Sequence, residues 1–236
     1  MIRFVCLNAF IAIHTVIFCL LAILLSLFDK SGKLNRFYVH IPWSRAILRV
    51  CGIKVRVKGK KNVRDDVPTV FMCNHQSYFD IFALLGYLPA DFKFIMKEEL
   101  MKIPLLGLAM KRAGHIGIKR ENAREAIRSM DKVAERIRSG TSVVVFPEGT
   151  RSMDGRLQPL KKGGFHMALK SGCDIVPVAI SNSCRIVTKG SLKINKGSFD
   201  IHFGKPISIK DYGRNNMAEL MERVREAILN QMEEVF

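Results

Sequence analysis

The sequence lacks paired-cysteine motifs, internal repeats and low-complexity stretches. None of its six cysteines belongs to a Cys-x-x-Cys pair, and two of them, Cys6 and Cys19, lie in an apolar run near the start of the chain. This spacing favours neither a zinc site nor a disulfide framework. Unpaired cysteines are typical of a reducing, cytoplasmic setting.

Acidic residues are scarce relative to basic ones. There are 21 Asp and Glu against 38 Lys and Arg, which gives a formal net charge of +17. Such a surplus indicates an anionic partner: nucleic acid, acidic phospholipid, or a phosphorylated substrate with an acidic carrier. The length of 236 residues, 48% of them hydrophobic, suffices for one sizeable α/β domain with an appendage.

Formal charge is absent from Phe4 to Phe28, a run that is almost wholly apolar. As a helix this run would reach about 37 Å, against roughly 30 Å of bilayer hydrocarbon. We therefore expect a membrane segment that spans the bilayer or lies tilted in it. A cleaved signal peptide is the weaker alternative, because the run exceeds the roughly 7–15 apolar residues usual there and lacks a small-x-small cleavage site.

Positive residues flank this run unequally. Arg3 precedes it, whereas Lys30, Lys33 and Arg36 follow it closely. The positive-inside rule then places the main domain on the cytoplasmic side of the cell inner membrane.

A second, part-apolar segment runs from Phe37 to Ile53 and carries Trp43 and Tyr38 among arginines. It is interpreted either as an interfacial helix or as an ordinary core helix, because amphipathicity alone does not say what covers the apolar face. We expect membrane-anchoring helices in residues 1–53 and the catalytic domain in residues 54–236.

Beyond this segment, short β-rich runs alternate with helical ones, which predicts an α/β sheet. The last two expected strands are apolar throughout and should lie centrally, covered on both faces. Expected strands are Lys54–Lys58, Thr69–Cys73, Phe92–Met96, Gly114–Ile118, Ser142–Phe146 and Ile175–Ile180. Expected helices are Asn122–Ser139, with Asn122 and Glu125 as a capping box and Gly140 as its stop, and Met217–Met232.

His75 comes directly after the expected strand that ends at Cys73, a position where open α/β sheets place their sites. Asp80 follows five residues later, about 140° away on a regular helix, because each residue turns about 100°. We therefore expect His75 in a turn before the helix that carries Asp80. The carboxylate can then accept a hydrogen bond from one ring nitrogen and leave the other as a base.

Such a pair lacks a nucleophile, so a substrate hydroxyl would supply the attacking oxygen. A lone histidine at a strand end is more often a structural cap, and Cys73 is more simply a small buried hydrophobe than a nucleophile. The remaining histidines have no comparable carboxylate partner and are expected to be structural: His14, His40, His115, His166 and His202.

Cations follow three other expected strands. Phe146-Pro147-Glu148-Gly149-Thr150-Arg151-Ser152 contains a glycine for a tight turn and an arginine whose planar fork suits phosphate. Lys97 and Arg120 lie after two further strands. Each alone is typical of a solvated edge; together, at strand ends near His75, they would form a phosphate site.

Together these segments resemble the glycerolipid acyltransferase family, in particular its bacterial 1-acyl-sn-glycerol-3-phosphate acyltransferases. All four family blocks occur in order and span about half of the chain. They are His-x4-Asp in Asn74–Asp80, Gly-x-Ile-x-Ile-x-Arg in Gly114–Arg120, Phe-Pro-Glu-Gly-Thr-Arg-Ser in Phe146–Ser152, and Val-Pro-Val in Ile175–Ile180.

The resemblance implies an α/β fold in which helices cover a mixed sheet, with an N-terminal membrane helix or two-helix anchor. It implies that His75 removes the proton from the sn-2 hydroxyl of a lysophosphatidate, which attacks the thioester of acyl carrier protein or coenzyme A. Asp80 would orient the imidazole. The product is phosphatidate for phospholipid biosynthesis, and neither a metal nor a cofactor is implied beyond the thioester co-substrate.

The resemblance also assigns binding residues. Those that would hold the acceptor are Glu148, Gly149, Thr150 and Arg151; those for its phosphate are Lys97 and Arg120; Pro177 would lie near the acyl path. The expected partners are a phospholipid membrane surface, the lysophospholipid and the thioester donor, and not nucleic acid.

Several alternatives stay open. Gly117 and Lys119 stand where Phe and Asp are commoner in the second block, which leaves the acceptor headgroup open. Another lysolipid acceptor, or a thioesterase that activates water with the same histidine, is compatible with the four blocks. A basic membrane or nucleic-acid binding module accounts for the charge but not for His75 and Asp80. The apolar stretch Ile103–Met110 lines either an acyl tunnel or the core.

Overall fold

The computed structural model describes residues 1–29, 32–119, 123–213 and 215–233. Within these ranges a seven-stranded sheet has the order β1-β7-β6-β2-β5-β3-β4. Its strands are β1 (Ile53–Lys58), β2 (Val70–Cys73), β3 (Lys93–Lys97), β4 (Ile116–Ile118), β5 (Val143–Val145), β6 (Ile175–Ser181) and β7 (Gly197–Phe203). Strands β2 to β6 are parallel, β7 is antiparallel to β6, and β1 is parallel to β7, so the sheet is mixed, as expected.

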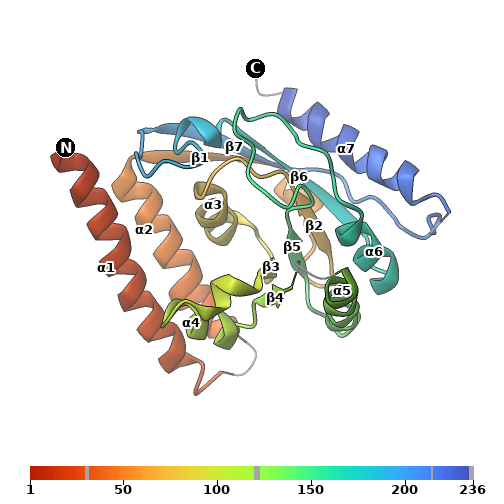
Figure 1. Cartoon of the computed structure of the whole chain (residues 1–236), viewed down its shortest axis with the longest axis horizontal. Helices are drawn as coiled ribbons and strands as arrows, with labels where there is room; N and C mark the ends of the chain where they lie inside the picture. Colours follow the sequence, from red (N-terminus) through yellow and green to blue (C-terminus); the bar gives the residue numbers. More distant parts are fainter. Residues whose placement is uncertain (30–31, 120–122, 214, 234–236) are drawn as a thin grey trace.

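Helices cover both faces of the sheet (Figure 1). On one face lie α2 (Ile41–Cys51) and α3 (Phe79–Tyr87), with α1 (Ile2–Leu25) outside them and α4 (Leu106–Arg112) near the C-terminal end of α1. On the other lie α5 (Ala123–Arg138), α6 (Lys162–Ser171) and α7 (Met217–Glu233). A π-helical turn, Asn35–His40, precedes α2, and short 3-10 turns occupy Lys60–Asn62, Glu98–Lys102 and Ser183–Arg185.

The apolar strands alternate between two cores. In β2, Phe71 packs with α2 and α3, whereas Val70 and Met72 pack with α5, α6 and α7. All residues of β2, β5 and β6 are buried. These strands need no polar face, because each face of the sheet is covered by helices. The predicted central position of the last two strands is confirmed.

The six expected strands and both expected helices are present, with ends within a few residues of those expected. Gly140 has φ +101° just after α5, consistent with its role as a stop. The expected cap Asn122 lies outside the described residues. Strand β7 was not expected; it is held between β1 and β6 by pairings to residues far away in the sequence.

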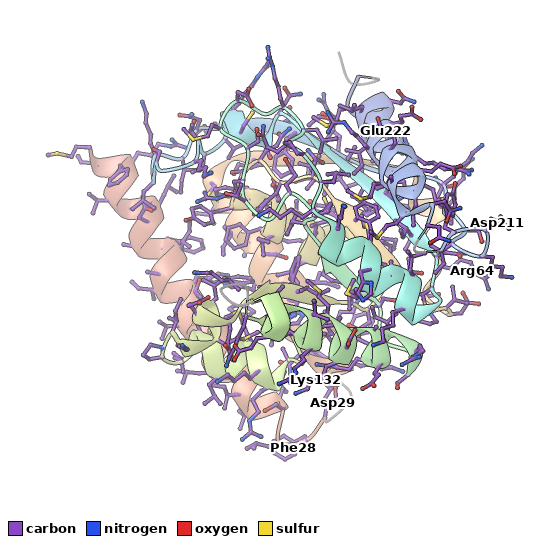
Figure 2. The ribbon with its side chains drawn as sticks, turned by 45° about the vertical axis from the view of Figure 1, so that its right-hand side comes forward. Phe28, Asp29, Arg64, Lys132, Asp211 and Glu222 are labelled. Atoms are coloured by element: carbon purple, nitrogen blue, oxygen red, sulfur yellow. The ribbon has the colours of Figure 1, made fainter. Side chains whose placement is uncertain are left out.

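Helix α1 is the one segment of the described ranges that is long and apolar enough to cross a membrane, judged by length and composition. Its mean hydropathy is 2.4, and most of its surface is exposed. Both ends contact the domain: Arg3 donates to the carbonyls of Ile194 and Cys51, and Ala22 packs against Ala109 of α4. Just beyond α1, Phe28 points away from the protein (Figure 2) and is 77% exposed.

Helix α2 belongs to the domain core on one side and to the surface on the other. Ile47 and Leu48 are buried and pack in the same cluster as α3. Val50 on the opposite side, and Phe37 and Tyr38 before the helix, are about half exposed or more. The expected domain boundary after residue 53 falls one residue into β1. The division into a membrane-anchoring region and a catalytic domain stays a prediction.

Candidate active site

The carboxyl ends of the parallel strands meet at one edge of the sheet, where β2 passes into a turn, Asn74–Tyr78. Asn74 is buried and fixes the start of this turn. Its amide group donates to the carbonyl of Ile180 at 2.8 Å and accepts from the amide N–H of the same residue at 2.6 Å. The turn is thereby joined to β6 before α3 begins at Phe79.

His75 and Asp80 form a hydrogen-bonded pair across this turn. Nδ1 of His75 lies 2.8 Å from Oδ2 of Asp80, and the two side chains are 15% and 0% exposed. The same carboxylate oxygen accepts from the amide N–H groups of Gln76 and Ser77 at 2.7 and 2.9 Å. With the Nδ1 proton directed at the carboxylate, Nε2 has a free lone pair and can act as a base. The predicted geometry of the pair is confirmed.

The imidazole of His75 is also held by an aromatic neighbour. It stacks on the ring of Phe146 with centroids 4.0 Å apart and an interplanar angle of 19°. Phe146 in turn stacks on Phe94, with centroids 6.2 Å apart. The stack limits rotation of the imidazole, so that Nε2 keeps one direction.

Glu148 clamps the backbone of the reacting turn. Its Oε1 accepts from the His75 amide N–H at 2.6 Å, and its Oε2 accepts from that of Gln158 at 2.7 Å. Burial raises the pKa of Glu148 to about 7, although these two donors act in the opposite sense. Because the side chain is 2% exposed, its carboxylate faces protein backbone, and its geometry is that of a residue that positions His75.

The rest of this loop presents polar groups at the same edge. Gly149 has φ +74°, as the expected tight turn requires. Thr150 is exposed, and its hydroxyl accepts from Nζ of Lys189 at 3.0 Å. The guanidinium carbon of Arg151 lies 3.6 Å from the ring centroid of Tyr78, and its Nη1 is buried with no hydrogen-bond partner among the described residues. Arg151 is thus a fixed cation with a donor to spare.

The other expected site residues are less closely joined to His75. Lys97 ends β3 at the same edge, where it is half exposed and lies 3.5 Å from a carboxylate oxygen of Glu99. Arg120 lies outside the described residues. Pro177 is buried in β6, next to Gly204 and on the face that bears α7.

In the described ranges, neither a cysteine nucleophile nor a metal site provides an alternative to the His75–Asp80 pair. Burial raises the pKa of the Cys73 thiol well above its ordinary value, the reverse of what an activated nucleophile needs. Among the described residues, no three His, Cys, Asp or Glu side chains are grouped so that they could hold a metal ion.

An apolar cavity of about 100 Å³ lies on the α1 side of the sheet. Phe94 belongs to its wall and also to the aromatic stack that ends at His75. Of the stretch Ile103–Met110, three residues line the cavity, namely Leu106, Ala109 and Met110, whereas Pro177 does not line it. The remaining lining includes Ala22, His40, Trp43, Ile81, Leu85 and His115.

Sequence reasoning missed several residues that position this site. Asn74, Ser77 and Ser152 all lie inside the quoted motifs. They are neither titratable nor cationic, so their residue types alone do not indicate a role in the site. The amide N–H of Ser152 donates to the His75 carbonyl at 2.8 Å, and Oγ of Ser77 donates to the carbonyl of Val187 at 3.0 Å. Lys189 lies outside every motif, and no local signal indicates its contact with Thr150.

The chain is similar in sequence and in fold to known acyltransferases. A family model described as Acyltransferase matches residues 54–181, more than half of the chain. The chain is 36% identical over 206 residues to a chloroplastic 1-acyl-sn-glycerol-3-phosphate acyltransferase of Brassica napus, covering 84% of this chain and 59% of that one. It is 30% identical over 195 residues to a 1-acyl-sn-glycerol-3-phosphate acyltransferase of Limnanthes alba, covering 82% of this chain and 68% of that one.

The crystal structure of the 1-acyl-sn-glycerophosphate (LPA) acyltransferase of Thermotoga maritima has the same fold, with a TM-score of 0.84 at 24% identity, covering 99% of this chain and 95% of that one. The chain spans 57–60% of the length of the first relatives that it matches. The family model matches more than half of the chain, and the chain covers more than two thirds of the Limnanthes alba protein. The chain belongs to the acyltransferase family.

Proposed function

We propose that the protein transfers a fatty acyl group from an acyl carrier protein or coenzyme A thioester to the sn-2 hydroxyl of 1-acyl-sn-glycerol-3-phosphate, forming phosphatidate. The observation that carries this proposal is the hydrogen-bonded His75–Asp80 pair at the carboxyl edge of the parallel strands. Support comes from the family membership and from the names of the relatives.

In the proposed reaction, Nε2 of His75 takes the proton of the acceptor hydroxyl as its oxygen attacks the thioester carbonyl. Asp80 stabilises the imidazolium that forms, as a carboxylate does in a catalytic triad. The carbon–sulfur bond then breaks, and the thiolate leaves and recovers the proton from His75. The step yields an ester and a free thiol, and it forms no acyl-enzyme.

The acceptor phosphate is proposed to lie against Arg151, whose buried Nη1 has no hydrogen-bond partner in the described part of the chain and lies beside the turn of His75. Gly149 and Thr150 provide the backbone and hydroxyl of the same loop. Lys97 and Arg120 are proposed as further cations for the phosphate. Glu148 acts in this scheme through the backbone of His75.

The apolar cavity is proposed to hold part of an acyl chain. Its described lining residues carry no carboxylate or ammonium group, and Phe94 connects its wall to the aromatic stack under His75. Burial lowers the pKa of His40 to about 4 and holds that of His115 well below its ordinary value, so that both lining imidazoles are neutral near pH 7. An uncharged wall suits a hydrocarbon chain.

Helix α1 is proposed to attach the protein to the cytoplasmic face of the inner membrane. Because both ends of α1 contact the domain, a crossing of the bilayer would take Ile194 and Cys51 into hydrocarbon with it. We therefore propose that α1 lies within one leaflet, with its exposed apolar side in lipid. This placement brings the site to the surface where a lysophospholipid acceptor resides.

The test supplies detergent-solubilised protein with an acyl thioester and lysophosphatidate and compares His75→Ala with His166→Ala. His166 lies on α6, and its Nε2 is 3.9 Å from a carboxylate oxygen of Asp131 on α5. It is a suitable control because it has a carboxylate neighbour, as His75 does. We expect phosphatidate from wild type and from His166→Ala, and none from His75→Ala. Full activity in His75→Ala would refute the mechanism.

Two further arms separate the alternatives. Acyl release without any acceptor would favour a thioesterase over a transferase. Replacing lysophosphatidate by a lysophospholipid with a neutral headgroup tests the acceptor, and a preference for the neutral headgroup would refute the assignment of lysophosphatidate. Acyl transfer by wild type excludes a module that only binds lipid or nucleic acid.

A further inference from the structure

The segment from Ile186 to Lys196, here called the strap, joins the 3-10 turn after β6 to β7. It contains three lysines and no acidic residue. Ile186, Val187 and Ile194 are buried, whereas Leu192 is 62% exposed. An exposed leucine between anchored apolar residues is not explained by the packing of the strap.

The inner end of the strap is attached to the reacting turn. The carbonyl of Val187 accepts from Oγ of Ser77, two residues after His75, at 3.0 Å. Nζ of Lys189 donates to Oγ1 of Thr150 at 3.0 Å, in the loop that also carries Arg151. The strap therefore contacts both segments that make up the proposed site.

The outer end of the strap is attached to α1. The carbonyl of Ile194 accepts from Arg3 at 2.6 Å, and the carbonyl of Leu192 accepts from the side-chain amide of Asn8 at 3.3 Å. Figure 1 shows the connection between β6 and β7 beside the N-terminal end of α1. One continuous segment thus connects the apolar helix with the turn of His75.

The surface around Leu192 combines exposed apolar groups with positive charge. On α1, Ile2, Phe4 and Val5 are 81%, 44% and 57% exposed. Lys193 and Lys196 follow Leu192 on the strap and are exposed. This pattern fits the headgroup layer of an anionic membrane, where apolar tips enter the acyl boundary and lysines meet lipid phosphates. An acidic soluble partner would use the lysines but not the leucine.

Resting on the proposed function, we propose that the strap is a second membrane contact, separate from the apolar helix itself. It docks on anionic phospholipid through Leu192 and Lys193. Through Val187 and Lys189 it holds the turn of His75 at a fixed depth relative to the layer in which the acceptor lies. The strap would then matter for an acceptor in a bilayer and not for one dissolved in water.

The test compares wild type with Leu192→Ser combined with Lys193→Gln. Each protein is assayed with lysophosphatidate embedded in phosphatidylglycerol vesicles and with a short-chain lysophosphatidate dissolved below its micelle concentration. We expect a loss of about 5-fold or more on vesicles, the effect of one lysine near an anionic surface, and activity within about 2-fold of wild type in solution. Flotation with the same vesicles should show weaker binding.

A matched control carries Ile127→Ser with Lys132→Gln, both exposed on α5 across the sheet, where Figure 2 labels Lys132. It should behave as wild type. Equal losses of the strap variant on both acceptors would show a structural role, and unchanged vesicle activity and flotation would show no membrane contact; either overturns the proposal. A raised Michaelis constant for acyl carrier protein thioester alone would identify an acidic protein partner instead.

The proposed function fails separately from this inference. If wild type transfers no acyl group to either acceptor, the assignment as a lysophosphatidate acyltransferase is wrong. Flotation of the strap variant and of its α5 control still decides the membrane contact in that case, because it requires no turnover.

Discussion

Nδ1 of His75 lies 2.8 Å from Oδ2 of Asp80 because the four residues between them do not form a continuous helix. α3 begins only at Phe79, so Asp80 stands in its first turn and His75 precedes it. The amide N–H groups of Gln76 and Ser77 hold the same oxygen. The carboxylate is therefore fixed by the backbone, and the imidazole aligns to it.

Asp80→Asn should lower kcat about 10²- to 10⁴-fold, with little change in the Michaelis constants for donor and acceptor. An amide lacks the charge that stabilises the imidazolium, and its NH₂ group favours the wrong tautomer of His75. Steady-state kinetics on both substrates provide the measurement. Asp131→Asn, which alters the carboxylate near His166, serves as the control and should keep wild-type kcat. A change confined to the Michaelis constants would contradict the orienting role.

Arg151→Lys should raise the Michaelis constant for lysophosphatidate about 10-fold and leave that for the thioester donor unchanged. Lysine retains the charge but loses the planar fork and the stacking on Tyr78 that fixes its direction. Arg156→Lys is the control, because that side chain is 88% exposed. An unchanged acceptor constant, or an equal rise for the donor, would argue against contact between Arg151 and the phosphate.

The part of the site that could be predicted from the sequence is local. The five-residue spacing of His75 and Asp80 excludes a regular helix and so implies a turn, which the structure contains. The apolar composition of β5 and β6 implies burial on both faces, and each is buried throughout. In these cases neighbouring residues decide the outcome.

The part that could not be predicted depends on contacts between distant segments. The resemblance assigns Glu148 to the acceptor, and that role stays a prediction. In the structure its carboxylate accepts from the amides of His75 and Gln158, and neither pairing has a sequence signature. β7 has the alternating apolar residues of a strand, Phe199, Ile201 and Phe203. Its place between β1 and β6 has no local signal, because those pairings join positions far apart in the chain. Lys189 reaches Thr150 only after β6 and the strap are placed.

Ala109→Leu should reduce activity with long-chain acyl donors more than with short-chain ones. Ala109 is 5% exposed and lines the apolar cavity of about 100 Å³, so a larger side chain there occupies space proposed for the acyl chain. The measurement is kcat/KM across a series of acyl thioesters. Leu108→Ala, which changes a 46% exposed residue on the same helix, should leave the chain-length profile unchanged. A uniform loss at all chain lengths would point to a packing defect.

Glu148→Gln should remove a pH dependence of stability. Burial raises the pKa of Glu148 from its ordinary 4.5 to about 7 in the folded protein. The folded state then binds the proton more tightly than the unfolded state, so the free energy of unfolding falls as pH rises from 4.5 to 7. A separation of about 2.5 pKa units sets the upper bound of this loss on the order of 3 kcal/mol.

Glutamine resembles the protonated carboxyl, since each is neutral. Glutamine does not titrate, whereas Glu148 loses its proton near pH 7 in the folded protein. Urea unfolding in detergent at pH 5 and pH 8, with wild type and Glu148→Gln measured together, isolates this group from all others. Wild type should lose more stability than the variant between the two pH values. If both proteins lose the same amount, Glu148 ionises in the folded protein as it does in the unfolded chain, and the clamp on His75 costs no desolvation.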